Sequence, residues 1–251
     1  MRKIYKRRDN LLIPYNENYI IEIMVVIAYV RHGKRDSTPE TIFRDGSPGT
    51  IPCFLTKEGI EQAHKAGKEL AQFRISRLIS SPLDRTLQTA SLIKYEYFTK
   101  TGTHLEIEFP EPLLIERQVG KLNNGPVPGG IPWLEFRNNQ ARTGYPDVED
   151  FNSIKNRIER FVNKVQIKKR ENGLIVASTH QDTVHAAAAQ ALGYDELNPM
   201  FTPGVPEGSI TIISYRTGNE AKVIGDTEVM TYGSTHLSTD EVKNVETLLR
   251  N

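Results

Sequence analysis

Short apolar runs that end at polar or charged residues dominate the hydrophobic pattern of the chain. Residues 24–30 read MVVIAYV and residues 174–178 read LIVAS. A continuous apolar run of this length, rich in β-branched residues, is typical of a strand buried on both faces of a parallel sheet. We therefore expect two central strands here, with shorter strands at residues 77–80 and 105–109.

Between these runs, apolar residues recur at three- and four-residue intervals, which is the spacing of helices with one buried face. The segments with this spacing are residues 56–73, 81–97, 151–165 and 238–249. Residues 184–192 predict a further, alanine-rich helix that Gly193 ends. Thr56 and Ser81 are placed to cap the first two helices, and Ser238 with Glu241 has the spacing of a capping box. Residues 209–215 and 220–224 predict an antiparallel hairpin at the margin of the sheet.

Strands that alternate with helices predict a three-layer α/β/α sandwich with a mixed, mainly parallel sheet. A chain of 251 residues can form one large domain of this class, and we assign it to residues 24–251. Residues 1–23 form a basic N-terminal extension. Residues 120–150 are rich in Gly, Pro and Asn, and we interpret them as an inserted lobe or lid.

Composition excludes several classes of partner and site. The chain has 32 Lys and Arg against 31 Asp and Glu, so its net charge of +1 favours neither a nucleic-acid nor a membrane partner. The single cysteine, Cys53, excludes an internal disulfide and a multi-cysteine metal site. The apolar run at residues 19–30 contains Glu22 and is too short to cross a bilayer, so we expect a cytoplasmic protein. The sequence is compatible with a monomer or a homo-oligomer.

Each of the two central strands delivers a histidine to its C-terminal end. Arg31, His32 and Gly33 follow the first strand, and His180 follows the second. Because ligands bind at the carboxyl edge of open α/β sheets, neighbouring parallel strands would bring both imidazoles into one cleft. From Arg31 and His32 alone, a surface loop with a charged pair remains an equal alternative.

Further charged residues follow the shorter strands. Arg85 lies in the first turn of a predicted helix, where a cation opposes the macrodipole unless an anion lies there. Glu116 and Arg117 follow another apolar run. Guanidiniums and imidazoles together suit a phosphate dianion, and a neutral histidine can act as the nucleophile of phosphoryl transfer. With no cluster of Asp or Cys to hold Mg²⁺ or Zn²⁺, we expect no metal and no cofactor.

These residues lie in blocks that resemble the histidine phosphatase superfamily, also called phosphoglycerate mutase-like. The resemblance spans roughly residues 24–215, and the order of the blocks makes it specific. The matching blocks are Arg31-His32-Gly33, Leu55-Thr56-Lys57-Glu58-Gly59 with Gln62-Ala63, Ser80-Ser81-Pro82-Leu83 with Arg85 and Gln88-Thr89-Ala90, Glu116-Arg117 with Gly120, Ser178-Thr179-His180, and Val205-Pro206-Glu207-Gly208-Ser209-Ile210.

The resemblance implies a phosphoglycerate mutase-like fold and a role for each matching residue. His32 would attack phosphorus to form a phosphohistidine, while Arg31, Arg85 and His180 hold the phosphoryl oxygens beside Gly33. Glu116 would protonate the leaving alkoxide and then activate water. Arg117 would add a further contact to substrate or phosphate.

The chain also departs from the patterns of individual branches. Phosphoglycerate mutases carry a Trp-Asn pair shortly after Arg-His-Gly, where this chain has Lys34-Arg35-Asp36-Ser37, and an aromatic residue at the position of Val119. The acid-phosphatase branch has Arg-His-Gly-x-Arg-x-Pro, which Arg35 fits and Ser37 does not. That branch uses an aspartate directly after its second histidine, and the offset of Asp182 by one residue makes it a backup proton donor.

We therefore expect a metal-independent phosphomonoesterase that acts through a phosphohistidine on a small phosphorylated metabolite. A cofactor-dependent phosphoglycerate mutase is the first alternative, because its acid motif is present. A non-catalytic phospho-ligand binding module is the second, although retention of both histidines and Glu116 argues against it. Residues 34–52 and 120–150 are expected to select the organic part of the substrate.

Overall fold

A computed structural model describes the chain in eight segments. These are residues 5–8, 11–14, 23–36, 53–118, 149–167, 172–194, 204–217 and 227–250. Most of the predicted substrate-selecting loop at 34–52 and nearly all of the predicted lobe at 120–150 lie outside the described residues. The description therefore concerns the sheet, its helices and the site that they form.

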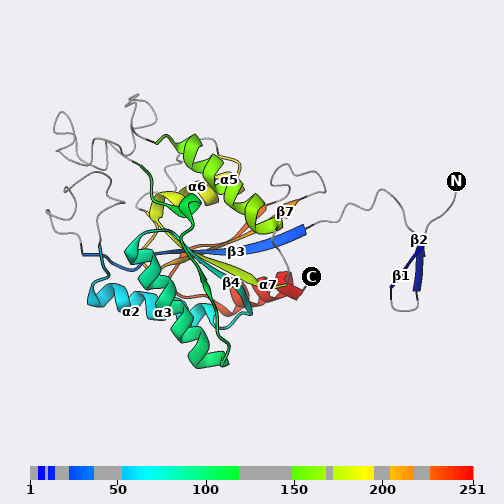
Figure 1. The fold of residues 1–251 in the computed structure, drawn as a ribbon, viewed down its shortest axis with the longest axis horizontal. Coiled ribbons are helices and arrows are strands. Elements are labelled where there is room, and N and C mark those ends of the chain that lie inside the picture. Colours follow the sequence, from blue (N-terminus) through cyan, green and yellow to red (C-terminus); the bar gives the residue numbers. More distant parts are fainter. Residues whose placement is uncertain are drawn as a thin grey trace.

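A mixed sheet forms the centre of the domain (Figure 1). Its six strands run in the order β5 (Ile107–Glu108), β4 (Ile75–Ser80), β6 (Leu174–Thr179), β3 (Ile23–Arg31), β7 (Ile210–Thr217) and β8 (Thr227–Ser234). Strands β5, β4, β6 and β3 are parallel, whereas β7 is antiparallel to both β3 and β8. The two predicted central strands are thus direct parallel neighbours, with Val30 paired to Ser178.

Helices cover both faces of the sheet, which gives the predicted three layers (Figure 1). Alternate residues of β3 point to opposite faces, so both faces must be buried. Ile27 and Tyr29 pack with helices α5 (Phe151–Ile167) and α6 (Gln181–Ala191). Val26 and Ala28 lie in the second cluster, with helices α2 (Lys57–Leu70), α3 (Asp84–Thr101) and α7 (Thr239–Arg250).

Two of the predicted helix caps are confirmed and one is wrong. The Thr56 hydroxyl accepts from the Gly59 amide, and Ser238 and Glu241 bond reciprocally. Helix α3, however, begins at Asp84, after an N-cap at Leu83 that makes no side-chain capping bond. Ser81 is not a cap because its hydroxyl bonds the imidazole of His180 instead.

The edges of the sheet differ most from the sequence-based expectations. Strand β5 has two residues, and a short 3-10 helix, η1 (Pro112–Leu114), follows it. The antiparallel partner of β7 is Thr227–Ser234, which the hydrophobic pattern missed, whereas residues 220–224 lie outside the described residues. Within the N-terminal extension, β1 (Tyr5–Arg8) and β2 (Leu11–Pro14) form an antiparallel pair that was not predicted.

No helix in the described segments is long and apolar enough to cross a membrane.

Candidate active site

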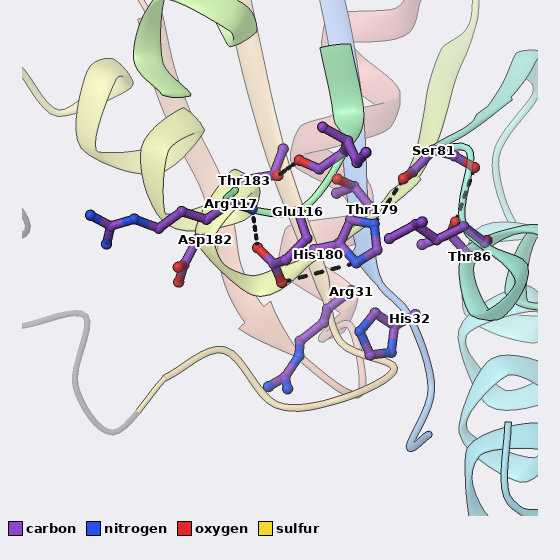
Figure 2. A network of polar contacts seen from close by, with 12 residues as sticks. Arg31, His32, Ser81, Thr86, Glu116, Arg117, Thr179, His180, Asp182 and Thr183 are labelled. Atoms are coloured by element: carbon purple, nitrogen blue, oxygen red, sulfur yellow. Dashed lines mark hydrogen bonds and ion pairs between the residues drawn. The ribbon is translucent and has the colours of Figure 1, made fainter. Parts of the chain in front are cut away.

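The two predicted histidines meet where β3 and β6 end side by side (Figure 2). The backbone amide of His32 donates to the Thr179 carbonyl over 3.0 Å, which joins the two strand ends directly. The imidazole rings of His32 and His180 lie with centroids 5.3 Å apart in an edge-on arrangement. The parallel pairing therefore brings together residues that are far apart in the sequence.

The hydrogen bonds of His32 leave one ring nitrogen available for attack. Its Nδ1 lies 2.8 Å from the Gly33 carbonyl oxygen, which can only accept. Nδ1 therefore carries the proton, and in the neutral ring Nε2 keeps its lone pair. The Gly33 amide donates to Thr89, so Gly33 orients His32 and does not offer this amide to a ligand.

Gly33 is also required by close packing. A Cβ atom at Gly33 would lie 2.1 Å from the Gly59 carbonyl oxygen, and one at Gly59 would lie 2.0 Å from the Lys34 carbonyl oxygen. The first turn of α2 thus packs directly on the backbone that follows β3. The absence of a side chain at Gly33 therefore allows a close contact between two parts of the chain.

The tautomer of His180 is fixed by two neighbours. Its Nδ1 lies 3.2 Å from a terminal nitrogen of Arg85, which can only donate, so Nδ1 accepts. Nε2 therefore carries the proton and donates to the Ser81 hydroxyl over 2.8 Å. For His180 to donate to a phosphoryl oxygen, Nδ1 must take up a proton, and a bound dianion favours that protonation.

Burial and positive charge keep both histidines neutral. Burial, followed by the charge of Arg85, holds the pKa of His32 well below its usual range, and Arg31 and Arg35 lower it further. Burial and Arg85 likewise lower the pKa of His180. An unprotonated imidazole is the form that can act as a nucleophile, and the surroundings keep His32 in that form near neutral pH.

Arg85 holds a buried positive charge with unused donors. It lies in the first turn of α3, as predicted, and only 2% of its surface is exposed. Its Nε and one terminal nitrogen have no hydrogen-bond partner among the described residues. Burial lowers the pKa of Arg85 to about 10, so it remains charged at neutral pH. Buried donors of this kind indicate an anion site at the N-terminus of the helix.

Two further arginines, Arg31 and Arg35, add positive charge near His32. Arg31 donates to the Val205 carbonyl and lies 3.5 Å from a carboxylate oxygen of Glu207, so it is partly neutralised. Arg35 was not among the predicted site residues. Its charge nevertheless lowers the pKa of both histidines and of Arg85. The sequence signal was the Arg-His-Gly-x-Arg pattern, which the missing proline had weakened.

Glu116, the predicted acid, lies beside His180 (Figure 2). One carboxylate oxygen of Glu116 is 4.0 Å from Nδ1 of His180, and the other accepts from the Arg117 amide. The Arg117 side chain is buried and donates to the Glu149 carbonyl. Asp182 lies 3.9 Å from Nδ1 of His185. Arg117 thus contacts a neighbouring segment, whereas Glu116 lies beside His180 and Asp182 lies beside His185.

Within the described residues, no group of three or more His, Cys, Asp or Glu side chains is arranged to hold a metal ion.

Because the native state keeps both site histidines unprotonated, stability should depend on pH. In the unfolded chain each histidine takes up a proton below about pH 6.5, whereas the buried rings resist protonation. We expect the free energy of unfolding to decrease as the pH is lowered from 7 to 5.5. The decrease should be at most about 1.4 kcal/mol per pH unit for each histidine.

Urea unfolding in phosphate- and sulfate-free buffer measures this dependence. His32→Asn should flatten the curve, whereas His104→Asn, at an exposed position, should leave its shape unchanged. Stability that stays constant or rises as the pH falls through this window would contradict the assignment of neutral histidines.

Comparison with known proteins gives relatives over most of the chain. A 2,3-bisphosphoglycerate-dependent phosphoglycerate mutase of Thermoplasma acidophilum is 25% identical over 196 residues, covering 78% of this chain and 90% of the mutase. A probable fructose-2,6-bisphosphatase, TIGAR A, of Danio rerio is 26% identical over 63% of this chain and 57% of its own length. The solved mycobacterial glucosyl-3-phosphoglycerate phosphatase has a TM-score of 0.66 at 20% identity, covering 84% of this chain and 99% of that chain.

The structural likeness shows the fold, which is phosphoglycerate mutase-like. The family model of the histidine phosphatase superfamily (branch 1) matches residues 27–226, a range that contains every predicted site residue. The chain belongs to the histidine phosphatase superfamily.

Proposed function

We propose that this chain is a metal-independent phosphomonoesterase in which His32 carries the phosphoryl group between two half-reactions. The observation that carries the proposal is the buried guanidinium of Arg85, whose unused donors lie beside two neutral histidines. A phosphoryl group is the ligand that supplies acceptors for such donors and balances their charge.

The proposed reaction proceeds in two displacements. Nε2 of His32 attacks phosphorus while the bond to the ester oxygen breaks, and Glu116 gives its proton to the departing alkoxide. Water then attacks the phosphohistidine, and the Glu116 carboxylate takes one proton from that water. The nitrogen–phosphorus bond breaks, so the products are the alcohol and inorganic phosphate. Arg31, Arg85 and protonated His180 would hold the phosphoryl oxygens, whose charge they stabilise.

The first prediction concerns the nucleophile. The protein should hydrolyse p-nitrophenyl phosphate in the presence of excess EDTA, because the proposed chemistry uses protein cations only. His32→Ala should reduce turnover to the uncatalysed background, since it removes the attacking nitrogen. His104→Ala, at an exposed position, should keep the wild-type rate.

Two results would reject the phosphatase assignment. Phosphate binding without turnover would identify a binding module. Conversion of 3-phosphoglycerate to 2-phosphoglycerate in the presence of 2,3-bisphosphoglycerate, with little phosphate release, would identify a mutase. The mutase remains the second candidate because a mutase relative aligns over 90% of its length, whereas the departures at residues 34–37 and Val119 favour the phosphatase.

The second prediction concerns the proton donor. Glu116→Gln should lower kcat/KM for an alkyl ester such as glycerol 2-phosphate by about 10² or more, because an alkoxide needs a proton to leave. The loss for p-nitrophenyl phosphate should be less than about tenfold, because p-nitrophenolate leaves without one. The ratio kcat/KM is the quantity to compare, since it excludes the later hydrolysis of the phosphohistidine.

Asp182→Asn is the matched control, because Asp182 is the backup candidate and lies one helical turn from His185. If Glu116→Gln slows both esters equally and Asp182→Asn discriminates between them, the proton donor is Asp182. If Glu116→Gln slows the alkyl ester far more than p-nitrophenyl phosphate and Asp182→Asn does not, the proposed role of Glu116 is supported.

The proposed partner is a small phosphorylated metabolite. A substrate panel should include the compounds named for the relatives, namely glucosyl-3-phosphoglycerate, fructose 2,6-bisphosphate and α-ribazole 5′-phosphate. Phosphate release from each member would define the organic part of the substrate.

A further inference from the structure

Glu116 lies on a segment without regular secondary structure, directly after η1. Neighbouring side chains hold this segment by its backbone. One terminal nitrogen of Arg157, on α5, donates to the Leu113 carbonyl over 2.8 Å and to the Ile115 carbonyl over 3.1 Å. A single guanidinium therefore fixes two of the three peptide carbonyls that precede the proposed acid.

Two threonines from the strand and helix that flank His180 complete this attachment. Thr179 donates its hydroxyl to the Leu114 carbonyl over 2.7 Å, and Thr183 donates to the Ile115 carbonyl over 3.0 Å. Figure 2 shows both threonines close to His180. All three carbonyls from Leu113 to Ile115 thus accept side-chain hydrogen bonds. These contacts connect the segment to the elements that carry the histidine site.

The other edge of the Arg157 guanidinium binds Glu149. Its Nε and second terminal nitrogen lie 2.5 and 2.9 Å from the two carboxylate oxygens, and both side chains are mostly buried. Glu149 in turn bonds the residues that follow Glu116: its amide donates to the Gln118 carbonyl over 2.7 Å, and its carbonyl accepts from Arg117. Arg157 and Glu149 therefore restrain the chain on both sides of Glu116.

We propose that Arg157 is a positioning residue: it holds the carboxyl group of Glu116 within reach of the leaving-group oxygen. This inference rests on the proposed function, because it concerns proton donation by Glu116. Small displacements of a catalytic group slow a reaction strongly, and a backbone without ladder hydrogen bonds needs other restraints. A planar guanidinium that bridges two carbonyls and a carboxylate supplies a restraint that an ammonium group does not reproduce.

Arg157→Lys tests the inference because it keeps the charge and removes the planar fork. We expect kcat/KM for glycerol 2-phosphate to fall about tenfold or more, with less than about threefold loss for p-nitrophenyl phosphate. Inhibition by inorganic phosphate should be unchanged, since lysine keeps the positive charge that Arg157 places near His180. Lys155→Gln is the matched control: Lys155 is on the same helix and bonds the Tyr194 carbonyl, so both esters should keep their wild-type rates.

The double variant separates positioning from general damage. In a Glu116→Gln background, Arg157→Lys should cause no further loss with the alkyl ester, because the group that it positions is already inactive. If Arg157→Lys does not fold, Thr183→Val removes one hydrogen bond to the Ile115 carbonyl and should show the same ester dependence in weaker form.

The outcomes distinguish this inference from the proposed function. If Glu116→Gln discriminates between the esters and neither Arg157→Lys nor Thr183→Val does so, the positioning role is wrong while the proposed function stands. Equal losses with both esters, or additive losses in the double variant, also overturn the positioning role. If Glu116→Gln itself does not discriminate, the proton-donor assignment fails first and the inference fails with it.

Discussion

The buried positive charge of Arg85 is the constraint on which the rest of the site depends. Burying a guanidinium without matching acceptors is costly, and a cation in the first turn of a helix opposes the macrodipole as well. Two of its nitrogens lack partners among the described residues. The carboxylate of Glu116 and the acidic Asp84 in the same helical turn offset part of this cost, but they leave two donor nitrogens without an acceptor in the part of the chain that the structure describes. An arriving dianion would supply both the missing acceptors and the missing charge, which is why the arrangement favours phosphoryl chemistry.

Together with burial, the same charge keeps both histidines unprotonated. Arg85 donates to His180 and is the strongest charged neighbour that lowers the pKa of His32. A bound phosphoryl group would reverse this effect at His180, since negative charge favours protonation of the ring. Substrate binding would therefore convert His180 into a donor while leaving His32 to attack. Both histidines stand at the ends of adjacent, buried strands, whereas the proposed acid stands on an irregular segment that side chains must hold.

Much of the fold followed from residue patterns, and the misses have physical reasons. The two apolar strands, their parallel contact and most of the helices were predicted because burial on both faces leaves a continuous apolar run, and burial of one helix face leaves helical spacing. Ser81 was misassigned because a hydroxyl before a proline resembles a cap, whereas His180 offered it a buried partner from across the fold. Strand β8 was missed because residues 227–234 mix polar and apolar side chains without strict alternation.

The site residues that lie in family blocks were predicted from the sequence. The residues that act through contacts between distant elements were missed. The structure brings His32, His180, Arg85 and Glu116 together, while Arg117 contacts Glu149. The roles of Arg35 and Arg157 depend on which elements pack side by side, and no local pattern contains that information.

The central claim is that His32 itself carries the phosphoryl group, and trapping the intermediate tests it most directly. Rapid denaturing quench at alkaline pH, which preserves the nitrogen–phosphorus bond, followed by peptide mass spectrometry should find one phosphoryl group on the peptide that contains His32. The adduct should disappear on acid treatment. A phosphoryl group on another residue, or turnover without any trapped adduct under conditions that accumulate product, would contradict the account.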